Sequence, residues 1–453
     1  MAQAYRICVA DTPANLASAV NELLSQGWNL YGYPFVHDPG NGNSARKTYC
    51  QAVLLGAAPS PAPTPEPTPV QAPKKAPSFR PVPARPPRPR VAATLRSVAA
   101  FLAILMGAYF LLEALIFRSG VYVRYLLPES TTGFFEMVTH FELQRKPSGR
   151  KEVMIVGSSR LGEGFSAKMA NELKPDDGYW FINGSIPGAN VRSWYYFIRE
   201  VDPRRDRYKA ILIPIDDYDD PDTFEDVPDR TMELREAVHR LRFTDILPFT
   251  FSFRTWPGRL QMLRGSLLKG LVYQRDFQEF VEDPPTRLKA VEDWRVSGES
   301  WLNTYGGIQH SLAGLAVDWT NRRITGMPSD MQGDNWIQDA RMHLLDPTPQ
   351  DGLNRTDQVR WIGALMDLYR GHQTKLIVYQ VPRGPAMPPY PRARLSWTTV
   401  DVLAKRPGAT IIDRHKFEGL ERPELFADWV HLNSEGRAVF TRMLAGVAKE
   451  IVH

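Results

Sequence analysis

The chain has 453 residues, 43% of them hydrophobic, which is enough for two or three domains with a real core. Its formal charge of +5 is small for this length and argues against nucleic-acid binding, because the bases gather in a linker and not on a folded segment. The two cysteines, Cys8 and Cys50, both lie near the N-terminus. The rest of the chain therefore has no disulfide framework and no cysteine-based metal site, and a cysteine-free region suits an oxidising compartment.

Residues 1–57 predict a small β-α-β-β module. Tyr5–Val9 is an apolar run typical of a strand, and Asp11 precedes a helical pattern of leucines and valines. Further strands are expected from Gly27–Gly32 and over Tyr49–Leu55. We expect this module to lie in the cytosol and to dock a protein partner.

The same stretch resembles a small family of uncharacterised bacterial modules. The resemblance rests on a G-W-N-L-Y-G turn at residues 27–32 and a C-Q-A strand at residues 50–52. It covers about 55 residues and implies no biochemical role. Trp28 and Tyr31 form a binding face in one interpretation and pack into the module's core in the other.

Residues 58–97 predict an extended linker. Proline recurs at every second or third position from Pro59 to Pro89, mixed with Ala, Thr and then Arg, and such a segment cannot build a core. Seven bases lie between Lys74 and Arg96. The segment is either a solvated tether or a basic stretch attracted to anionic lipid beside a membrane.

Val98–Phe117 predicts a membrane span, because twenty almost uncharged residues match a hydrocarbon core of roughly 30 Å. A buried core helix is the competing interpretation. More bases precede the span than follow it, so the N-terminus is predicted to be cytoplasmic and residues after 118 periplasmic, in a bacterial inner (cytoplasmic) membrane. Glu113, its one charge, either reaches the interface or marks a helix partner.

Residues 120–453 predict an α/β domain with a parallel sheet and helices on both faces. Helical patterns such as Val191–Glu200 and Thr356–Tyr369 separate apolar runs of strand character. Those runs are Val153–Val156, Trp180–Ile182, Ala210–Ile215, Leu376–Val381 and Thr410–Ile412.

Residues 220–350 lack a strand series, and we expect a helical insertion that caps the carboxyl edge of the sheet. Amphipathic pieces such as Asp229–Arg242 and Leu271–Val281 support this expectation. The tryptophans of the insertion either pack in its core or stack on sugar rings. They are Trp256, Trp294, Trp301, Trp319 and Trp336.

Two separated motifs predict nucleophilic chemistry. Ser158 and Ser159 follow the strand Val153–Val156, and ligands bind at that edge of open α/β sheets, although a serine there is also an ordinary helix cap. Asp428 precedes His431 by three residues, so the acid can orient the imidazole toward a serine from elsewhere in the fold. His415, two residues after Asp413, ranks second.

These motifs resemble the SGNH (GDSL-like) hydrolase superfamily, over residues 150–215 and 370–445. Gly157-Ser158-Ser159 stands where those proteins carry Gly-Asp-Ser, Asp428-x-x-His431 stands at their Asp and His, and 183–189 resembles their second block. The resemblance implies a three-layer α/β/α, flavodoxin-like domain with Ser159 as nucleophile, His431 as base and Asp428 as its orienting acid. The oxyanion would be met by N–H groups of Ser159 and Ser185.

Two positions depart from that pattern. Ser185 replaces the glycine of the second block, and Asp216 replaces the asparagine that donates to the oxyanion. A carboxylate accepts hydrogen bonds and cannot donate one. Either Asp216 is protonated, or Asn183 or Asn190 donates in its place, or the activity is slow or absent. The acids of residues 216–220 are also a candidate cation site, although no metal is our prediction.

Arg160 follows the nucleophile and is predicted either to bind a substrate carboxylate or phosphate or to pair with acids such as Glu163. The expected substrate-binding set is Arg160, Gly188, Asn190 and Asp216. The membrane-anchored members of the family include proteins of exopolysaccharide O-acetylation and teichoic acid D-alanylation. The resemblance therefore implies a serine esterase or O-acyltransferase for acetyl or other acyl groups on an envelope polysaccharide.

The predicted partners are the membrane, an acylated glycan or similar envelope polymer, and a protein bound by residues 1–57. No cofactor and no nucleic acid are expected. The alternative is an inactive SGNH-like binding or scaffold subunit of an envelope complex, which the replacement at Asp216 favours.

Overall fold

The computed structural model describes residues 2–10, 20, 28–37, 48–56, 91–175, 177–215, 232–253, 255–345, 355–386 and 399–453. The chain divides into two compact units, Met1–Arg88 and Pro89–His453. Each unit is described by itself.

The first unit contains a three-stranded antiparallel sheet. Its strands are β1 (Ala2–Ala10), β2 (Trp28–His37) and β3 (Thr48–Gly56), and β3 lies between the other two. Each strand contains a run predicted from apolar and β-branched residues, which fit a pleated surface. Of the helix predicted after Asp11, the structure describes Val20, which is helical and buried. Linker residues 57–90 lie outside the described residues.

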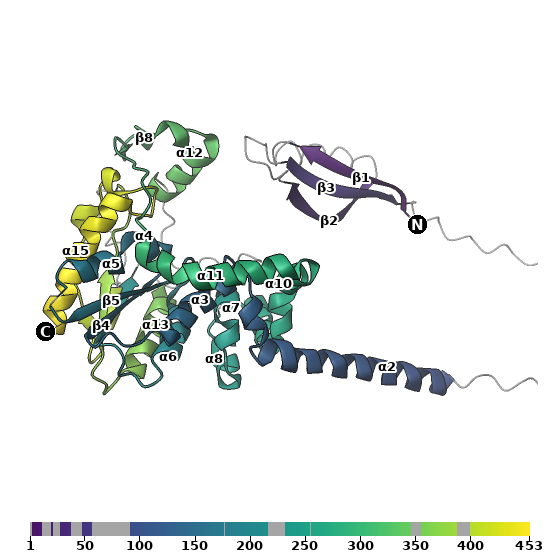
Figure 1. Cartoon of the computed structure of the whole chain (residues 1–453). Helices are drawn as coiled ribbons and strands as arrows, with labels where there is room; N and C mark the ends of the chain where they lie inside the picture. Colours follow the sequence, from purple (N-terminus) through teal and green to yellow (C-terminus); the bar gives the residue numbers. More distant parts are fainter. Residues whose placement is uncertain are drawn as a thin grey trace, which may run out of the picture. The chain divides into compact units, whose positions relative to one another are not determined.

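The second unit is built on a five-stranded parallel sheet, which confirms the predicted mixed α/β architecture (Figure 1). Its strand order is β10-β9-β6-β4-β5, so numbered along the chain the order is 2-1-3-4-5. In sheets of this order the crevice at the carboxyl ends of the first and third strands binds ligands. The strands are β4 (Lys151–Gly157), β5 (Tyr179–Ser185), β6 (Ala210–Ile215), β9 (Lys375–Gln380) and β10 (Thr410–Ile411).

Helices cover both faces of this sheet, because alternate strand residues point to opposite sides and both sides are apolar. Met154 and Val156 of β4 pack with one set of helices, and Val153 and Ile155 pack with the other. The first set is α3 (Thr131–Gln144), α6 (Val191–Val201), α13 (Arg355–Leu368) and α14 (Thr399–Leu403). The second set is α4 (Ser159–Gly164), α5 (Ala167–Glu172) and α15 (Ser434–Val452).

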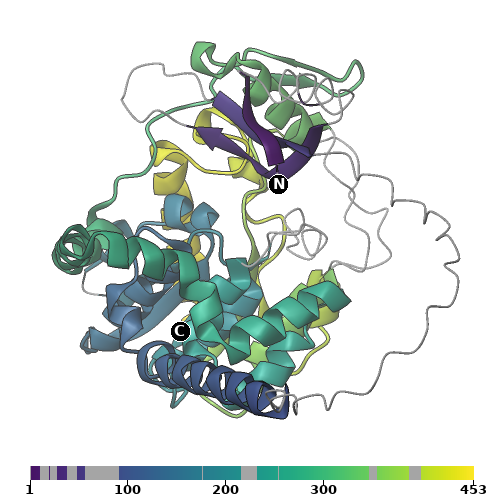
Figure 2. The same ribbon diagram turned by 90° about the vertical axis from the view of Figure 1, so that its right-hand side faces the viewer.

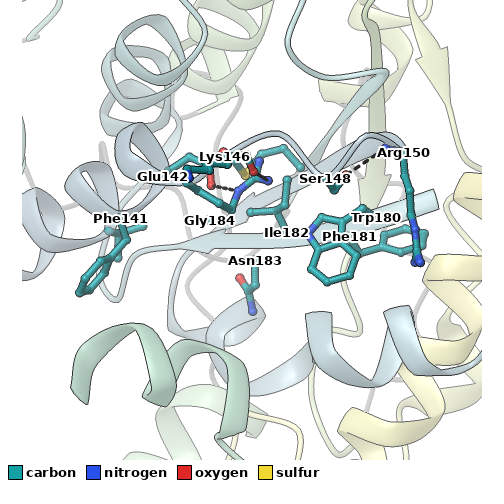
Figure 3. A pocket seen from close by; sticks show the side chains of 13 residues that line it. Phe141, Glu142, Lys146, Ser148, Arg150, Trp180, Phe181, Ile182, Asn183 and Gly184 are labelled. Atoms are coloured by element: carbon teal, nitrogen blue, oxygen red, sulfur yellow. Dashed lines mark hydrogen bonds and ion pairs between the residues drawn. The ribbon is translucent and has the colours of Figure 1, made fainter. Parts of the chain in front are cut away.

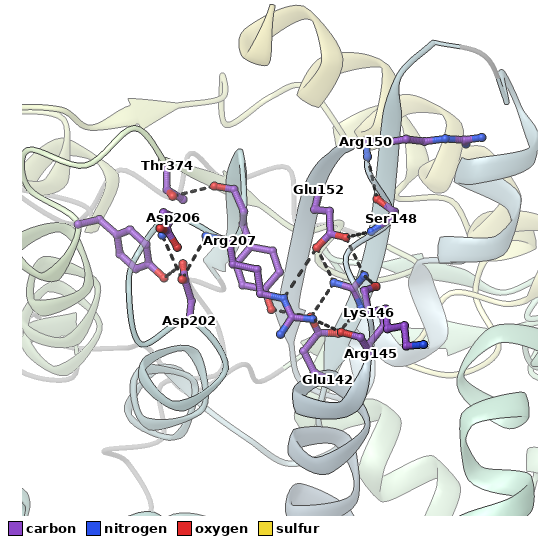
Figure 4. A network of polar contacts seen from close by, with 12 residues as sticks. Glu142, Arg145, Lys146, Ser148, Arg150, Glu152, Asp202, Asp206, Arg207 and Thr374 are labelled. Carbon is purple, nitrogen blue, oxygen red and sulfur yellow. Dashed lines mark hydrogen bonds and ion pairs between the residues drawn. The ribbon is translucent and has the colours of Figure 1, made fainter.

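At the amino-terminal edge of the sheet, an ion network joins α3 to β4 (Figure 4). Arg145 bridges the buried carboxylates of Glu142 and Glu152 at 2.8 and 2.6 Å, and Arg207 lies 2.9 Å from Glu142. Burial raises the pKa of the Glu152 carboxyl, but Arg145 and the Ser148 N–H outweigh burial and hold that pKa below its usual range. This edge is thus closed by charges that satisfy one another.

A long apolar helix begins the second unit. It comprises α2 (Val91–Leu112) and the π-helical turn η1 (Glu113–Arg118). The segment Ala100–Arg118 is long and apolar enough to cross a membrane by length and composition, and only 6% of its apolar window is buried. The helix begins at Val91, inside the range predicted for the linker, because no proline follows Pro89 there.

The insertion predicted over 220–350 is mostly helical in its described residues, and its two parts pack in different core clusters. Its first part packs against α3, α6 and η1. That part comprises α7 (Met232–Ala237), η4 (Val238–Arg240), η5 (Phe243–Asp245), α8 (Ile246–Thr250), α9 (Trp256–Leu267), α10 (Lys269–Glu282) and α11 (Pro284–Thr304).

The second part of the insertion packs beside the C-terminal loops through Leu312, Leu315 and Met331. It comprises the hairpin β7 (Ala316–Asp318) and β8 (Arg323–Thr325), then η6 (Ser329–Met331), α12 (Asp334–Ala340) and η7 (Arg341–Leu345). The remaining short turns of the second unit are η2 (Tyr122–Tyr125), η8 (Glu418–Leu420) and η9 (Pro423–Leu425).

The tryptophans of the insertion do not share one role. Trp294 packs partly buried against the first core cluster. Trp256 and Trp336 are 70% and 42% exposed. Core packing therefore fails as a common explanation, because two of these rings lie on the surface.

Candidate functional site

Ser159 lies at the carboxyl end of β4, as the first residue of α4. Gly157 ends the strand, and a Cβ there would meet the Leu161 side chain at 2.5 Å. A glycine is therefore needed for α4 to turn back tightly onto its own strand. Ser158 holds the helix-cap position, but its side chain makes no capping hydrogen bond. The ordinary capping interpretation of this serine pair does not describe the structure.

Asp428 and His431 lie on a tight loop between η9 and α15. The Asp428 Oδ1 accepts from the N–H groups of Val430 and His431 at 2.9 and 2.7 Å, and the Ala427 N–H donates to the His431 carbonyl. Asn433 then caps α15 by accepting from the Gly436 N–H at 2.9 Å. The three-residue spacing thus forms a self-bonded loop whose acid faces its own histidine.

The structure brings Ser159, His431 and Asp428 into one hydrogen-bonded chain. His431 Nδ1 lies 2.8 Å from Asp428 Oδ2, and His431 Nε2 lies 2.8 Å from Ser159 Oγ. Ser159 and His431 are 272 positions apart in sequence. The side chains of His431 and Asp428 keep partial access to solvent, and 21% and 28% of them are exposed. Access is what a site for an external substrate requires.

The protonation pattern follows from the acceptors. Burial raises the pKa of the Asp428 carboxyl, but bonds from the His431 ring and from the N–H groups of Val430 and His431 lower it more, so the net pKa is below its usual range. An ionised carboxylate only accepts, so the proton of neutral His431 sits on Nδ1. The Nε2 lone pair then accepts from the Ser159 hydroxyl.

Arg160 donates to backbone carbonyls, a role beside the substrate binding and the pairing with acids that the sequence suggested. It is 8% exposed, its Nε donates to the Val430 carbonyl at 3.2 Å, and one of its terminal nitrogens donates to the Arg383 carbonyl at 2.6 Å. Its guanidinium therefore ties α4 to the loop that carries His431. Sequence alone does not show that backbone carbonyls surround the group.

Two of the groups suggested as oxyanion donors, the Ser185 N–H and the Asn183 amide, have other hydrogen-bond partners. The Ser185 N–H donates to Asn183 Oδ1 at 3.0 Å, and the Asn183 amide donates to the Phe165 carbonyl at 2.9 Å, so both groups are engaged. The Ser159 N–H has no acceptor among the described residues. The Ser185 hydroxyl is buried and likewise lacks a partner there. Since Asn183 faces α4 and strand residues alternate, Ser185 lies on the same side of the sheet.

Gly188 and Asn190 have local structural roles. Gly188 has a φ of +77° and follows Pro187 in the turn closed by the Ala189 N–H and the Ile186 carbonyl, as a type II turn requires. Asn190 caps α6 by accepting from the Arg192 and Ser193 N–H groups, and its amide donates to Glu233. Neither contact supports the substrate-binding role predicted for these residues. Asp216 lies outside the described residues.

Sequence reasoning missed the segment around His310, which supports the loop that carries His431. Ile308 accepts from the Ser434 N–H, the Leu312 N–H donates to Phe426, and His310 Nδ1 donates to the Ala427 carbonyl at 2.8 Å. His310 Nε2 faces an Asp330 carboxylate oxygen at 3.2 Å. The contacts with Phe426, Ala427 and Ser434 join residues more than 100 positions apart, and only the folded chain brings them together.

A pocket of about 360 Å³ lies elsewhere on the second unit (Figure 3). Phe141 and Trp180 lie at its opposite ends, with Glu142 and Lys146 between them. Ser159, Asp428 and His431 do not line it. The pocket is therefore separate from the candidate catalytic site.

A comparison with known protein families finds a match in the first unit. Residues 2–54 match a family described as a domain of unknown function (DUF1737). That match spans the strands β1 to β3 and assigns them no activity. No curated protein matches the chain.

Proposed function

We propose that the chain is a membrane-anchored, SGNH-like serine esterase or O-acyltransferase that acts on O-acyl groups, acetyl foremost, of a cell-envelope or exported polysaccharide. The observation that carries the proposal is the hydrogen-bonded chain from Ser159 through His431 to Asp428. Its place at the end of the first strand of a 2-1-3-4-5 sheet is consistent with the three-layer, flavodoxin-like domain that the SGNH resemblance implies.

In the first half-reaction, Ser159 Oγ attacks the acyl carbonyl carbon while His431 Nε2 takes the hydroxyl proton. The carbonyl π electrons move onto oxygen. Collapse of this tetrahedral adduct breaks the bond to the leaving alcohol, which receives the proton from His431. Asp428 holds the Nδ1 proton and stabilises the imidazolium throughout. Ser159 then carries the acyl group.

In the second half-reaction, water or an acceptor hydroxyl gives its proton to His431 and attacks the acyl-serine. Collapse returns the proton to Ser159 Oγ and releases an acid or a new ester. Water makes the protein an esterase, and a sugar hydroxyl makes it a transferase. The same side chains serve both outcomes, so the accepting group decides between them.

Two donors fit the oxyanion in this proposal. The Ser159 N–H and the Ser185 hydroxyl both lack acceptors among the described residues, and both lie at the strand ends next to the reacting hydroxyl. A hydroxyl can rotate its proton toward a developing oxyanion. It would supply the donor that a carboxylate at Asp216 cannot.

The test uses the purified full chain and p-nitrophenyl acetate, with Ser158→Ala as the matched control for Ser159→Ala. We expect Ser159→Ala to lose about 10³-fold or more in kcat, because the nucleophile is gone. Ser158→Ala should keep most of the activity, since its side chain makes no cap. Equal turnover by wild type and Ser159→Ala would exclude the serine mechanism.

The second candidate is a catalytically inactive SGNH-like binding subunit of an envelope complex. One observation favours it, which is that the Ser185 N–H expected at the oxyanion is already bonded to Asn183. A fluorophosphonate probe separates the two candidates, because it reacts with an activated serine. Labelling of wild type but not of Ser159→Ala would rule out the inactive subunit.

The expected location is the bacterial inner membrane, with the first unit in the cytoplasm and the second in the periplasm. The apolar helix α2 and the bases that precede it support this orientation. Protease accessibility in intact spheroplasts tests it. Cleavage of the second unit, with the first unit protected, is the expected outcome.

A further inference from the structure

The end of the apolar helix is fixed to the second unit by charged side chains. Glu113 is 3% exposed, and its carboxylate accepts from the N–H groups of Lys269 and Gly270 at 2.7 and 2.8 Å. These are the first two residues of α10, whose N-terminus a carboxylate suits. Arg118 donates to the carbonyls of Ser266 and Leu267 at the end of α9. The α9–α10 corner is therefore held at the level of Glu113.

That level lies within the apolar segment and not beyond it. Glu113 precedes the end of the segment Ala100–Arg118 by five residues, or about 7 Å at 1.5 Å per residue. If α2 crosses a bilayer, the α9–α10 corner reaches the headgroup layer. Figures 1 and 2 agree in placing the α10 region beside the end of α2.

The helices at this corner turn their apolar side chains outward. In α9, Met262, Gly265 and Ser266 are buried, whereas Trp256, Leu260 and Leu267 are 70%, 52% and 44% exposed. The exposed residues are four and seven positions apart, which is one helix face. Ordinary surface helices bury such a face.

Neighbouring segments extend this surface. Phe243, Leu247, Phe251 and Leu271 are 74%, 58%, 52% and 40% exposed, and the Arg118 guanidinium lies 4.7 Å from the Phe243 ring centre. We call the seven residues the apolar face. They are Phe243, Leu247, Phe251, Trp256, Leu260, Leu267 and Leu271. Exposed apolar side chains gathered on helices that contact one another mark a candidate binding face.

The charges around the apolar face select the occupant. Among the described residues of 242–271, Arg242, Arg259 and Arg264 are accessible bases and Lys269 is buried, whereas the acid Asp245 lies 2.7 Å from Arg199 and is thus paired. Acids return only beyond this stretch, for example at Asp276 and Glu279. Bases with a Trp and leucines are what an anionic lipid interface attracts.

We propose that the apolar face lies in the headgroup region of the bilayer that α2 crosses, so that the second unit rests on the membrane instead of projecting from it on a stalk. This inference requires that α2 spans a membrane, as in the proposed function, but it is independent of catalysis. The bilayer is favoured over a protein partner because the face is continuous with α2, whose own apolar side chains are already exposed.

The test uses the full chain with Cys8→Ser and Cys50→Ser, reconstituted in nanodiscs of phosphatidylcholine and phosphatidylglycerol. A cysteine replaces Leu260 or Leu267 and carries an environment-sensitive NBD dye. The matched control is Leu173→Cys, because Leu173 is 41% exposed and follows α5 on the other side of the sheet. Lipids with a headgroup nitroxide then quench any dye within the headgroup layer.

We expect several-fold stronger nitroxide quenching and bluer emission at positions 260 and 267 than at position 173. Equal quenching at the three positions would overturn the proposal. Shielding at 260 and 267 in native membranes but not in lipid-only nanodiscs would also overturn it, because a protein would then cover the face. The readout needs no turnover, so an inactive chain with strong quenching would reject the proposed activity and keep this inference.

Discussion

The two edges of the parallel sheet use charged groups for opposite purposes. At the amino-terminal edge, Arg145 lies between Glu142 and Glu152, and both carboxylates are nearly inaccessible. At the carboxyl edge, the side chains of Asp428 and His431 are about a quarter exposed. Their hydrogen-bonded chain ends at the Ser159 hydroxyl. A closed network stabilises a join between elements, whereas an open chain leaves a nucleophile for another molecule. Burial and closure, and not the presence of charge, separate structure from chemistry here.

The largest expected effect on kcat comes from removing His431, the proposed base at the carboxyl edge. His431→Ala should lower kcat on p-nitrophenyl acetate by about 10³-fold or more, because nothing else takes the Ser159 proton. His415→Ala is the matched control, since that ring is 57% exposed and pairs with Glu418. Comparable losses in both variants would remove the assigned role of His431.

A smaller loss of kcat is expected when Asp428, the proposed orienting acid, is replaced. Asp428→Asn should lower kcat by about 10²–10⁴-fold, because an amide can donate to Nδ1 and so favour the tautomer with its proton on Nε2. Asp413→Asn makes the same change beside His415 and should leave kcat unaltered. Steady-state kinetics at several pH values measures both. Full activity of Asp428→Asn would contradict the proton placement on His431.

A change at the amino-terminal edge should affect stability and not chemistry. Arg145→Met leaves Glu142 and Glu152 buried with fewer partners, at a cost of about 3 kcal/mol. Tm should fall by roughly 2–4 °C for each kcal/mol, with kcat per folded molecule unchanged. Arg150→Met alters an exposed neighbour and serves as control. A fall in kcat with unchanged Tm would break the contrast between the edges.

The smallest expected effect is a difference in acid sensitivity. The folded-state pKa of Glu152 is lowered, so its contribution to stability is present above the unfolded value, about 4.3, and is lost as pH falls through the folded pKa. Glu152→Gln should therefore lower Tm at pH 7 but flatten its decline below pH ~4.5. Glu172→Gln, at a side chain 65% exposed, should leave the wild-type profile. Parallel profiles for wild type and Glu152→Gln would refute this assignment.

Much of the fold could be predicted because its signals are local. Each of the five predicted strands of the second unit contains or overlaps an observed one, since apolar β-branched runs bounded by turns have few alternatives. The insertion was predicted as a helical cap, but its division between two core clusters was not predicted, because helix periodicity shows which face is apolar but not what covers it. The same limit concealed the outward apolar face of α9.

The candidate site also contains features that the sequence could predict and features that it could not. Asp428 and His431 could be paired from their spacing, because both lie on one loop. The roles of Arg160, Asn183 and Asn190 were not predictable, since each polar group is engaged by backbone or side-chain groups that only the fold brings near. A donor's partner is a three-dimensional fact, and residue type does not reveal it.

The sequence by itself determined the strand runs, the apolar segment near residues 98–117 and the residue types able to act as acid, base and nucleophile. Tertiary structure alone decided that Ser159 and His431 meet at 2.8 Å and that Glu113 binds the start of α10. It also decided that the Ser185 hydroxyl, and not its N–H, lacks a partner within the described part of the chain. The physical reason is the distance along the sequence over which each kind of interaction acts. Propensity and periodicity act over a few residues, whereas these contacts close loops of 156 and 272 residues and exist only when the whole core is packed.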